Sequence, residues 1–190
     1  DQSGSGRHAT QTDTTVQPKI DLVNKQIDFK TAAYLNLPDG TVPYGNSNYT
    51  MTVRHNTING TYNTLVFSGY VPTGNAVNAL EYLSPKYDNF WWGNDLNAGS
   101  YAAGNVVTAK YNNTTGRTMY VNGTSVGTDA NTNRNSTTGY NAIAIRRYDP
   151  AAGLGSTTAL PLNGELYYVF LFNTALSDAD RTIVESLAIS

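Results

Sequence analysis

The sequence predicts an all-β sandwich or barrel, and three observations lead to this fold class. Short runs of β-forming residues recur along the chain at intervals of about 8–12 residues. Turn-forming Gly, Pro and Asn residues separate these runs. Only one segment, near the C-terminus, has the pattern of a helix, and no repeat of about 20–50 residues indicates a propeller or a solenoid.

Composition narrows the functional classes. A chain of 190 residues fits one domain and can bury enough apolar surface to fold without a disulfide or a metal. The absence of Cys excludes a disulfide scaffold, a thiolate zinc site and a cysteine nucleophile. The net charge of −2 argues against nucleic-acid binding, and no apolar run approaches the roughly 20 residues that span a membrane. The chain begins with Asp1 and has no signal pattern, so we expect a mature or excised piece.

Residues 1–18 differ in composition from the rest of the chain. They are rich in Gly, Ser, Thr and Gln and carry few apolar side chains, which is typical of a polar arm or linker. An extended arm packed on the domain is the alternative. We therefore expect one folded domain over residues 19–190.

The first predicted strands show alternation and clear turn signals. In residues 49–55, Tyr49, Met51 and Val53 fall on one face, and the residues between them on the other. His55 is interpreted as an ordinary surface residue rather than a catalytic base. The predicted strands of this half are 33–37, 49–55, 64–70 and 79–83.

The second half contains the strongest hairpin signal. Asn122-Gly123 separates two β segments, and a two-residue type I′ turn requires positive φ at both central positions. In the most apolar run, every second residue from Leu166 to Phe172 shares a face. The predicted strands of this half are 87–92, 106–111, 118–121, 125–128, 142–146 and 164–172.

One helix is predicted near the C-terminus. Ser177 is a suitable N-cap because Asp180 follows three residues later. Ile183, Val184 and Leu187 supply an apolar stripe.

The order of several segments resembles a known family. These segments are AYLNLP, YTMTVRHNT, LVFSGY, YDNFWWG, RTMYVNGTSVGT, AIAIRRY and LNGELYYVFLFNTALSDADRTIVESL. Over roughly residues 27–189 they resemble the laminin-G-like group of the concanavalin A-like lectin/glucanase superfamily. The resemblance implies a jelly-roll sandwich of two curved antiparallel sheets. Because that superfamily includes lectins, adhesion modules and glycan-cleaving enzymes, the site must decide the function.

The carboxylates argue against catalysis. The resemblance implies that glucanases of this superfamily carry closely spaced carboxylates on one strand. The only Glu residues here are Glu81, Glu165 and Glu185, and none has a carboxylate two positions away. We therefore predict a non-catalytic protein. The alternative is a glycan-cleaving enzyme in which Glu81 and Glu165 project from separate strands into one cleft, as the paired carboxylates of glycosidases require.

The segment from Tyr87 to Asp95 is the richest in sugar-binding residue types. Alternation separates Trp91 from Trp92, so one indole should be buried and the other should reach a surface or a loop. An exposed indole beside amides and carboxylates suits a sugar, because the ring stacks on C–H faces and the polar groups bind hydroxyls. The alternative is that both rings are core. The candidate ligand-binding residues are Tyr87, Asn89, Trp91, Trp92, Asn94, Asp95, Arg147 and Tyr148.

Metal binding is optional in this interpretation, and no cofactor is required. Calcium is common in the superfamily that the sequence resembles, and aspartate oxygens suit it. Asp88, Asp95, Asp129 and Asp149 are candidate ligands, although their spacing matches no dedicated calcium loop. Asp149 is also a candidate structural partner of Arg146.

Two functional hypotheses remain besides the enzyme. The first is a non-catalytic extracellular recognition module that binds glycans or glycoproteins weakly and multivalently, or mediates adhesion. The second is a structural surface domain of a virion or appendage protein, without a sugar site, that contacts neighbouring subunits. The excess of Asn and Thr, with few charges, favours an extracellular, cell-surface or virion-surface location, with Thr on solvent-facing strand positions and Asn in turns. An exposed aromatic platform on the concave face would support the first, and an aliphatic or covered face the second.

Overall fold

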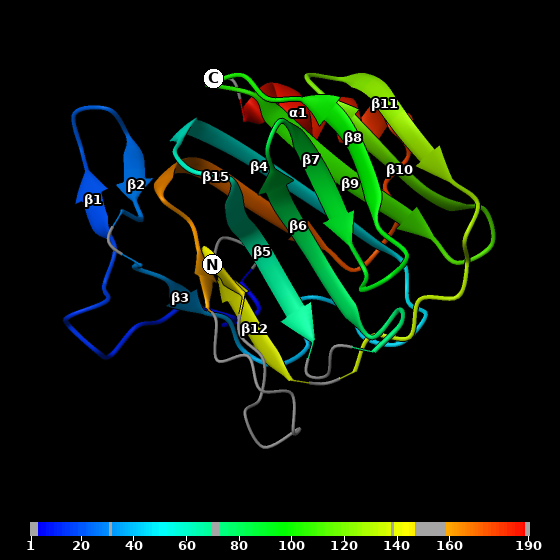
Figure 1. The fold of residues 1–190 in the computed structure, drawn as a ribbon, viewed down its shortest axis with the longest axis horizontal. Coiled ribbons are helices and arrows are strands. Elements are labelled where there is room, and N and C mark those ends of the chain that lie inside the picture. Colours follow the sequence, from blue (N-terminus) through cyan, green and yellow to red (C-terminus); the bar gives the residue numbers. More distant parts are fainter. Residues whose placement is uncertain (1–3, 31, 70–72, 138, 147–158, 189–190) are drawn as a thin grey trace.

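The computed structural model describes residues 4–30, 32–69, 73–137, 139–146 and 159–188. Two antiparallel sheets, of seven and six strands, stack face to face, and a short helix lies near the C-terminus (Figure 1). The predicted β-sandwich with one C-terminal helix is therefore confirmed. No helix in these described ranges is long and apolar enough to cross a membrane.

The two sheets have distinct strand orders. In spatial order, the seven-stranded sheet contains β1 (Lys19–Asp21), β2 (Gln26–Asp28), β15 (Gly164–Phe172), β4 (Tyr49–Ile58), β9 (Val106–Asn112), β10 (Gly116–Val121) and β11 (Thr124–Asp129). The six-stranded sheet contains β3 (Leu35–Asn36), β12 (Tyr140–Ile143), β5 (Tyr62–Gly69), β6 (Val77–Leu83), β7 (Lys86–Phe90) and β8 (Leu96–Ser100). A small separate pair joins β13 (Ile145–Arg146) to β14 (Leu160–Pro161).

The main core lies between the sheets. Tyr49, Met51 and Val53 of β4 all belong to it, as the alternation predicted. His55 continues this inward series and is also buried, so its interpretation as a surface residue was wrong. Its Nε2 lies 2.7 Å from the Tyr87 hydroxyl, and burial lowers its pKa.

Strand β15 departs from the predicted alternation. Its pairing with β4 shifts register twice, between Gly164 and Leu166 and again between Leu166 and Tyr168. Such bulges reverse which residues face inward. Leu166 is a core residue, but beyond the second bulge Val169 and Leu171 pack on the core. The prediction that Leu166, Tyr168, Phe170 and Phe172 share one face was wrong.

The helix α1 (Asp178–Leu187) is capped as predicted but buries a different face. The Asp180 amide donates to the Ser177 hydroxyl at 3.1 Å. The buried residues of the helix are Arg181 and Glu185, whereas Ile183 and Leu187 are exposed. Glu185 accepts from the Thr108 hydroxyl of β9 at 2.7 Å. The helix therefore packs on the seven-stranded sheet through polar contacts.

Threonines of that sheet are buried rather than solvent-facing. Thr50, Thr52 and Thr108 are fully buried, and the last two hydroxyls lie 3.0 Å apart. The predicted exposure of strand threonines is thus wrong at these positions. The turn prediction is confirmed at Asn122-Gly123, which have φ of 50° and 80° and join β10 to β11.

The described part of the N-terminal arm runs along β3. Thr10 and Asn36 exchange two backbone hydrogen bonds, of 2.9 and 2.8 Å. The Tyr34 amide donates to the Val16 carbonyl at 3.1 Å. These contacts are those of the alternative in which residues 1–18 pack on the domain.

Candidate functional site

Strand β7 separates the candidate residues onto opposite faces. Tyr87, Asn89 and Trp91 point into the inter-sheet core and are fully buried. The Trp91 indole donates to the Tyr49 hydroxyl at 3.2 Å, and that hydroxyl donates to Asn89 at 2.8 Å. These three candidates do not reach the surface, so the structure excludes them as direct contacts to a surface ligand. They form the inner support of the segment that follows.

Trp92 lies on the opposite side of the chain and is partly exposed. Its ring meets Phe90 edge to face, with centroids 5.7 Å apart. Its φ is +64°, and Gly93 follows with a φ of +80°. A bulky residue in the left-handed region is uncommon and costs of order 1–3 kcal/mol, so the surrounding structure must hold it there.

Hydrogen bonds from three directions fix this turn. The Asp95 carboxylate accepts from the Trp91 amide at 3.0 Å. The Trp92 carbonyl accepts from the Asn75 amide at 3.3 Å. Asn75 belongs to the loop between β5 and β6, so two loops meet at one end of the six-stranded sheet.

Arg117 of β10 supplies the third support from inside the sandwich. It is buried, and its guanidinium donates to the Asn89 carbonyl at 2.7 Å and also to the Asn94 carbonyl. It forms an ion pair with Asp129 at 2.8 Å and lies 4.0 Å from the Trp91 ring centroid. Local sequence patterns do not predict this role, because a contact between β10 and the turn after β7 depends on how the two sheets stack.

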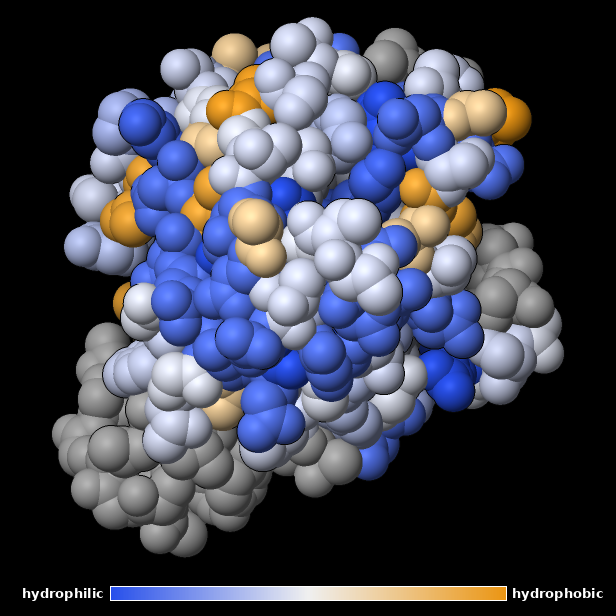
Figure 2. Space-filling model, turned by 90° about the vertical axis from the view of Figure 1, so that its right-hand side faces the viewer, coloured by the Kyte–Doolittle hydropathy of each residue, from blue (hydrophilic) through white to orange (hydrophobic). Residues whose placement is uncertain are grey.

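Amide side chains gather around the turn. Asn94 is exposed and donates to the Asn75 side chain at 2.6 Å. The Asn135 amide donates to the Asn75 carbonyl at 2.9 Å, which brings the segment after β11 to the same place. The right-hand side of Figure 1, where that segment runs, faces the viewer in Figure 2 and is mostly hydrophilic. We call Asn75, Trp92, Asn94 and Asp95 the Trp92 surface.

The rest of the outer face of the six-stranded sheet is closed. Phe67, Val77 and Ala79 are buried there and pack with Phe90 and Trp92. Among the described residues this face shows no linear platform of exposed aromatic rings.

Two buried carboxyl groups, of Glu81 and Asp88, also lie on the outer face of the six-stranded sheet. Glu81 accepts from the Thr64 hydroxyl at 3.0 Å and pairs with Arg146 at 3.1 Å. Its cross-strand partner is Asp88, which is also buried. Burial, with the nearby charges of Asp95 and Glu81, raises the pKa of Asp88 to about 7.

The two carboxylates of the enzyme hypothesis do not share a cleft. Leu80 and Tyr82 point into the core, so Glu81 between them faces outward from the six-stranded sheet. Leu166 points into the core from the seven-stranded sheet, and its neighbour Glu165 instead forms an ion pair with Lys30. The sandwich separates the two groups, and the proposed pairing of Glu81 with Glu165 was wrong.

The remaining candidate ligand-binding and metal-binding residues do not form one site in the described part of the chain. Arg147, Tyr148 and Asp149 lie outside the described residues. Asp129 pairs with Arg117, Asp95 holds the turn, and Asp88 lies on the closed face, so these aspartates have different roles. Within the described ranges no group of three or more His, Asp or Glu side chains could hold a metal ion.

Comparisons with known proteins support the fold. No family model and no curated protein matches the chain. Trypanosoma rangeli sialidase aligns with a TM-score of 0.59 and 15% identity over 85% of this chain and 27% of that chain. The CBM40 module of Ruminococcus gnavus IT-sialidase aligns with a TM-score of 0.58 and 15% identity over 73% and 82%. A botulinum neurotoxin type C structure aligns with a TM-score of 0.68 and 11% identity over 99% and 48%.

These similarities show a shared β-sandwich fold. The chain spans only about a quarter of the sialidase that it matches and about half of the toxin chain. It covers most of the CBM40 module, which is a domain of similar extent.

Proposed function

We propose that the chain is a non-catalytic, extracellular carbohydrate-binding module of the laminin-G-like type, located on a cell or virion surface. The observation that carries this proposal is the conformation of Trp92. Its ring is partly exposed, its backbone is held in the left-handed region, and a buried arginine fixes the turn from behind. Such strain persists only where the surroundings enforce it, and it often occurs at binding sites.

The groups around Trp92 suit a sugar. The indole stacks on the C–H face of a pyranose, while Asn75 and Asn94 offer amide groups and Asp95 offers a carboxylate for hydroxyls. Covering about 70 Å² of the ring gives about 1.7 kcal/mol at about 25 cal/mol/Å². Millimolar affinity needs about 4 kcal/mol net. A single site of this kind therefore binds weakly and works through multiple copies, as adhesion requires.

The structural neighbours support a carbohydrate-binding function but do not establish it for this chain. The CBM40 module was solved with α2,3-sialyllactose, and the uptake of botulinum neurotoxin type C is described as dependent on two ganglioside molecules. Each of these proteins is thus described as interacting with a glycan, and in the toxin the aligned region is about half of the chain. Sialylated and neutral glycans are therefore both included among the probes.

A multivalent form of the protein on a glycan array tests the proposal. We expect binding to a restricted set of glycans, and loss of binding in Trp92→Ala. The matched control is Tyr62→Ala, because Tyr62 is an exposed aromatic residue at the opposite end of β5 from the Trp92 surface. Absence of binding to any glycan at high valency, or equal loss in both variants, would refute the sugar site.

The second candidate function is a structural surface domain without a sugar site. The closed outer face made by Phe67, Val77 and Ala79 favours it, because no aromatic platform is offered within the described part of the chain. This function predicts no glycan binding and contacts with neighbouring subunits. The array distinguishes the two candidates.

A further inference from the structure

An unusual edge is found at the other side of the molecule. Strand β1 is the outermost strand of the seven-stranded sheet, and the β1–β2 hairpin projects at the left in Figure 1. Within the described residues no strand covers the outer edge of β1. An uncovered edge presents unpaired backbone groups that can pair with another chain.

Apolar side chains are exposed on this hairpin to a degree found nowhere else among the described residues. Ile20 is 72% exposed, Leu22 is 84% exposed and Val23 is 90% exposed. The turn that carries them is ordered, because Asp21 accepts from the Val23 and Asn24 amides at 3.0 Å each. The hairpin therefore exposes these three side chains to solvent in a fixed arrangement.

The three residues of β1 are complementary to themselves. Lys19 and Asp21 flank Ile20 symmetrically, with opposite charges. In an antiparallel pair of two β1 strands centred on Ile20, each Lys19 lies opposite Asp21 of the partner subunit, and the two isoleucines lie opposite each other. In a parallel pair, like charges would lie opposite each other. Opposite charges across a strand pair stabilise it and like charges destabilise it.

We propose that this edge is an interface between two copies of the chain, which pair antiparallel through β1 about a two-fold axis at Ile20. Neither Lys19 nor Asp21 has an ion-pair partner within 4.0 Å among the described residues. The Asp21 carboxylate accepts hydrogen bonds from Val23 and from the backbone and side chain of Asn24, and these neutral donors leave its negative charge unbalanced. A two-fold contact uses the same surface on both copies, which makes self-complementarity the requirement for it. The charge pattern selects a second copy as the partner over an uncharged apolar surface.

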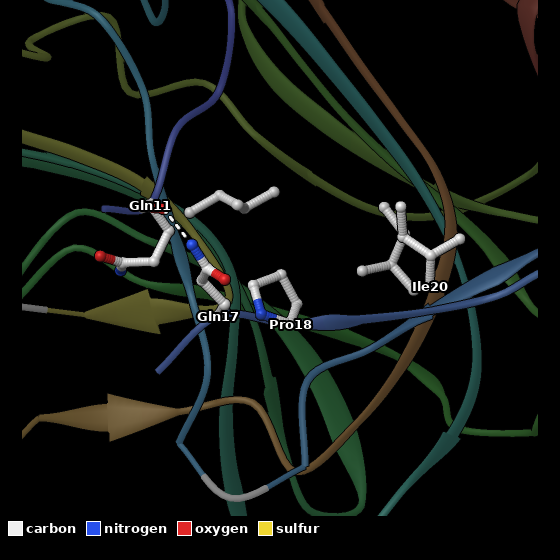
Figure 3. A pocket seen from close by; sticks show the side chains of 6 residues that line it. Gln11, Gln17, Pro18 and Ile20 are labelled. Atoms are coloured by element: carbon white, nitrogen blue, oxygen red, sulfur yellow. Dashed lines mark hydrogen bonds between the residues drawn. The ribbon is translucent and has the colours of Figure 1, made fainter. Parts of the chain in front are cut away.

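A cavity beside β1 fits the same arrangement. It has a volume of about 250 Å³ and is lined by Gln11, Gln17, Pro18, Ile20, Ile27 and Leu35. Figure 3 shows Pro18 between Gln17 and Ile20 along its rim, with Gln17 donating to the Gln11 carbonyl at 2.8 Å. Ile20 both lines this cavity and lies at the centre of the proposed strand pair, and Pro18 lies directly before β1. A second copy that pairs along β1 would therefore lie beside the cavity.

Charge reversal gives a sharp test that uses the whole chain. Lys19→Glu places two acidic pairs across the axis, and Asp21→Lys places two basic pairs there. Sedimentation equilibrium over a concentration series should show a dimer for the unchanged chain and a dissociation constant raised at least about tenfold for each single variant. An equimolar mixture of the two variants should recover the dimer, because every cross-axis pair in the heterodimer is then attractive.

The controls separate this interface from general association and from misfolding. Ile183→Asp changes an exposed apolar residue on α1 and should leave the dimer intact. Because Asp21 orders the turn, Ile20→Glu provides a second disruption that keeps those hydrogen bonds, and far-UV circular dichroism checks folding of all variants. A chain that stays monomeric up to about 1 mM, a dimer unaffected by Lys19→Glu and Ile20→Glu, or a mixture that stays monomeric while both variants are folded would overturn the proposal.

Discussion

Two adjacent tryptophans have opposite roles because a strand places successive side chains on opposite faces. Trp91 packs edge to face on Tyr111, with centroids 4.9 Å apart, and its indole N–H is hydrogen-bonded. Trp92 reaches the outer face and keeps part of its ring accessible. The sequence could predict that the two rings separate, but it could not predict which of them becomes core.

This difference gives the first prediction. Trp91→Ala should lower the free energy of unfolding by about 3–5 kcal/mol, since it opens a cavity in the inter-sheet core. Trp92→Ala should cost less than about 2 kcal/mol, because the residue is only partly buried and the turn keeps its hydrogen bonds. Urea unfolding measures both values. Equal losses would contradict the assignment of Trp92 as the less buried of the two rings.

The second prediction concerns the buried carboxyl of Asp88. Its pKa is raised to about 7 from 3.8, so the folded protein keeps a proton that the unfolded chain releases. This contribution to stability is fully present below pH 3.8 and is lost as pH rises to about 7, above which it stays constant. Asp88→Asn should remove this decline, and its stability relative to the unchanged chain should grow by at most about 1.4 kcal/mol per pH unit over that window.

Urea unfolding between pH 4 and pH 8 checks this expectation. Asp178→Asn is the matched control, because Lys110 lowers the pKa of that surface carboxyl and the shift therefore has the opposite direction. A difference between Asp88→Asn and the unchanged chain that does not vary with pH would show that Asp88 is ionised in the fold throughout.

At the scale of elements, the turn after β7 depends on a side chain from the opposite sheet. Arg117 donates to two carbonyls of the segment 89–94 and pairs with Asp129, which links β7, β10 and β11. A planar guanidinium can serve these acceptors at once, whereas a lysine ammonium cannot. Arg117 is thus a positioning residue for the Trp92 surface.

Arg117→Lys is the third prediction. It should keep the charge but leave buried carbonyls without donors, and destabilise the fold by about 2–4 kcal/mol. Below its unfolding temperature it should also weaken glycan binding by the Trp92 surface, because the turn loses its inner support. Binding on the array at reduced temperature, compared with a variant of similar stability loss in the core such as Met51→Ala, separates the two effects. Equal binding by both variants would contradict a positioning role.

The elements also show where sequence reasoning succeeds and where it fails. Local patterns were enough for β4, with its strict alternation, and for the Asn122-Gly123 hairpin, whose backbone requirement is local. Strand β8 was missed because Asn and Gly have low strand propensity, so only its pairing with β7 makes it a strand. The bulges of β15 and the polar docking of α1 depend on partners distant in sequence, and no local period encodes them.

At the scale of the whole molecule, the two sheets differ in whether an edge strand is covered by another segment. The edge of the six-stranded sheet at β3 is covered by the N-terminal arm, through the two hydrogen bonds between Thr10 and Asn36. The edge of the seven-stranded sheet at β1 is left uncovered within the described residues. The composition of residues 1–18 predicted a polar arm or linker, with a packed arm as the alternative. Composition cannot distinguish the two, because a few backbone hydrogen bonds can hold a segment that buries almost no apolar side chains.

Removal of residues 1–12 is the fourth prediction and tests this contrast. The sandwich should still fold, because the main core comes from the sheets, but the free energy of unfolding should fall by about 1–3 kcal/mol as the arm's hydrogen bonds and the packing of Ala9 on the core are lost. The newly uncovered β3 edge should add concentration-dependent association that Lys19→Glu does not suppress. Unfolding in urea and sedimentation of the truncated chain, with and without Lys19→Glu, measure both effects. If residues 1–12 were a free linker, truncation would change neither the stability nor the association, because the β3 edge would already be uncovered in the full chain.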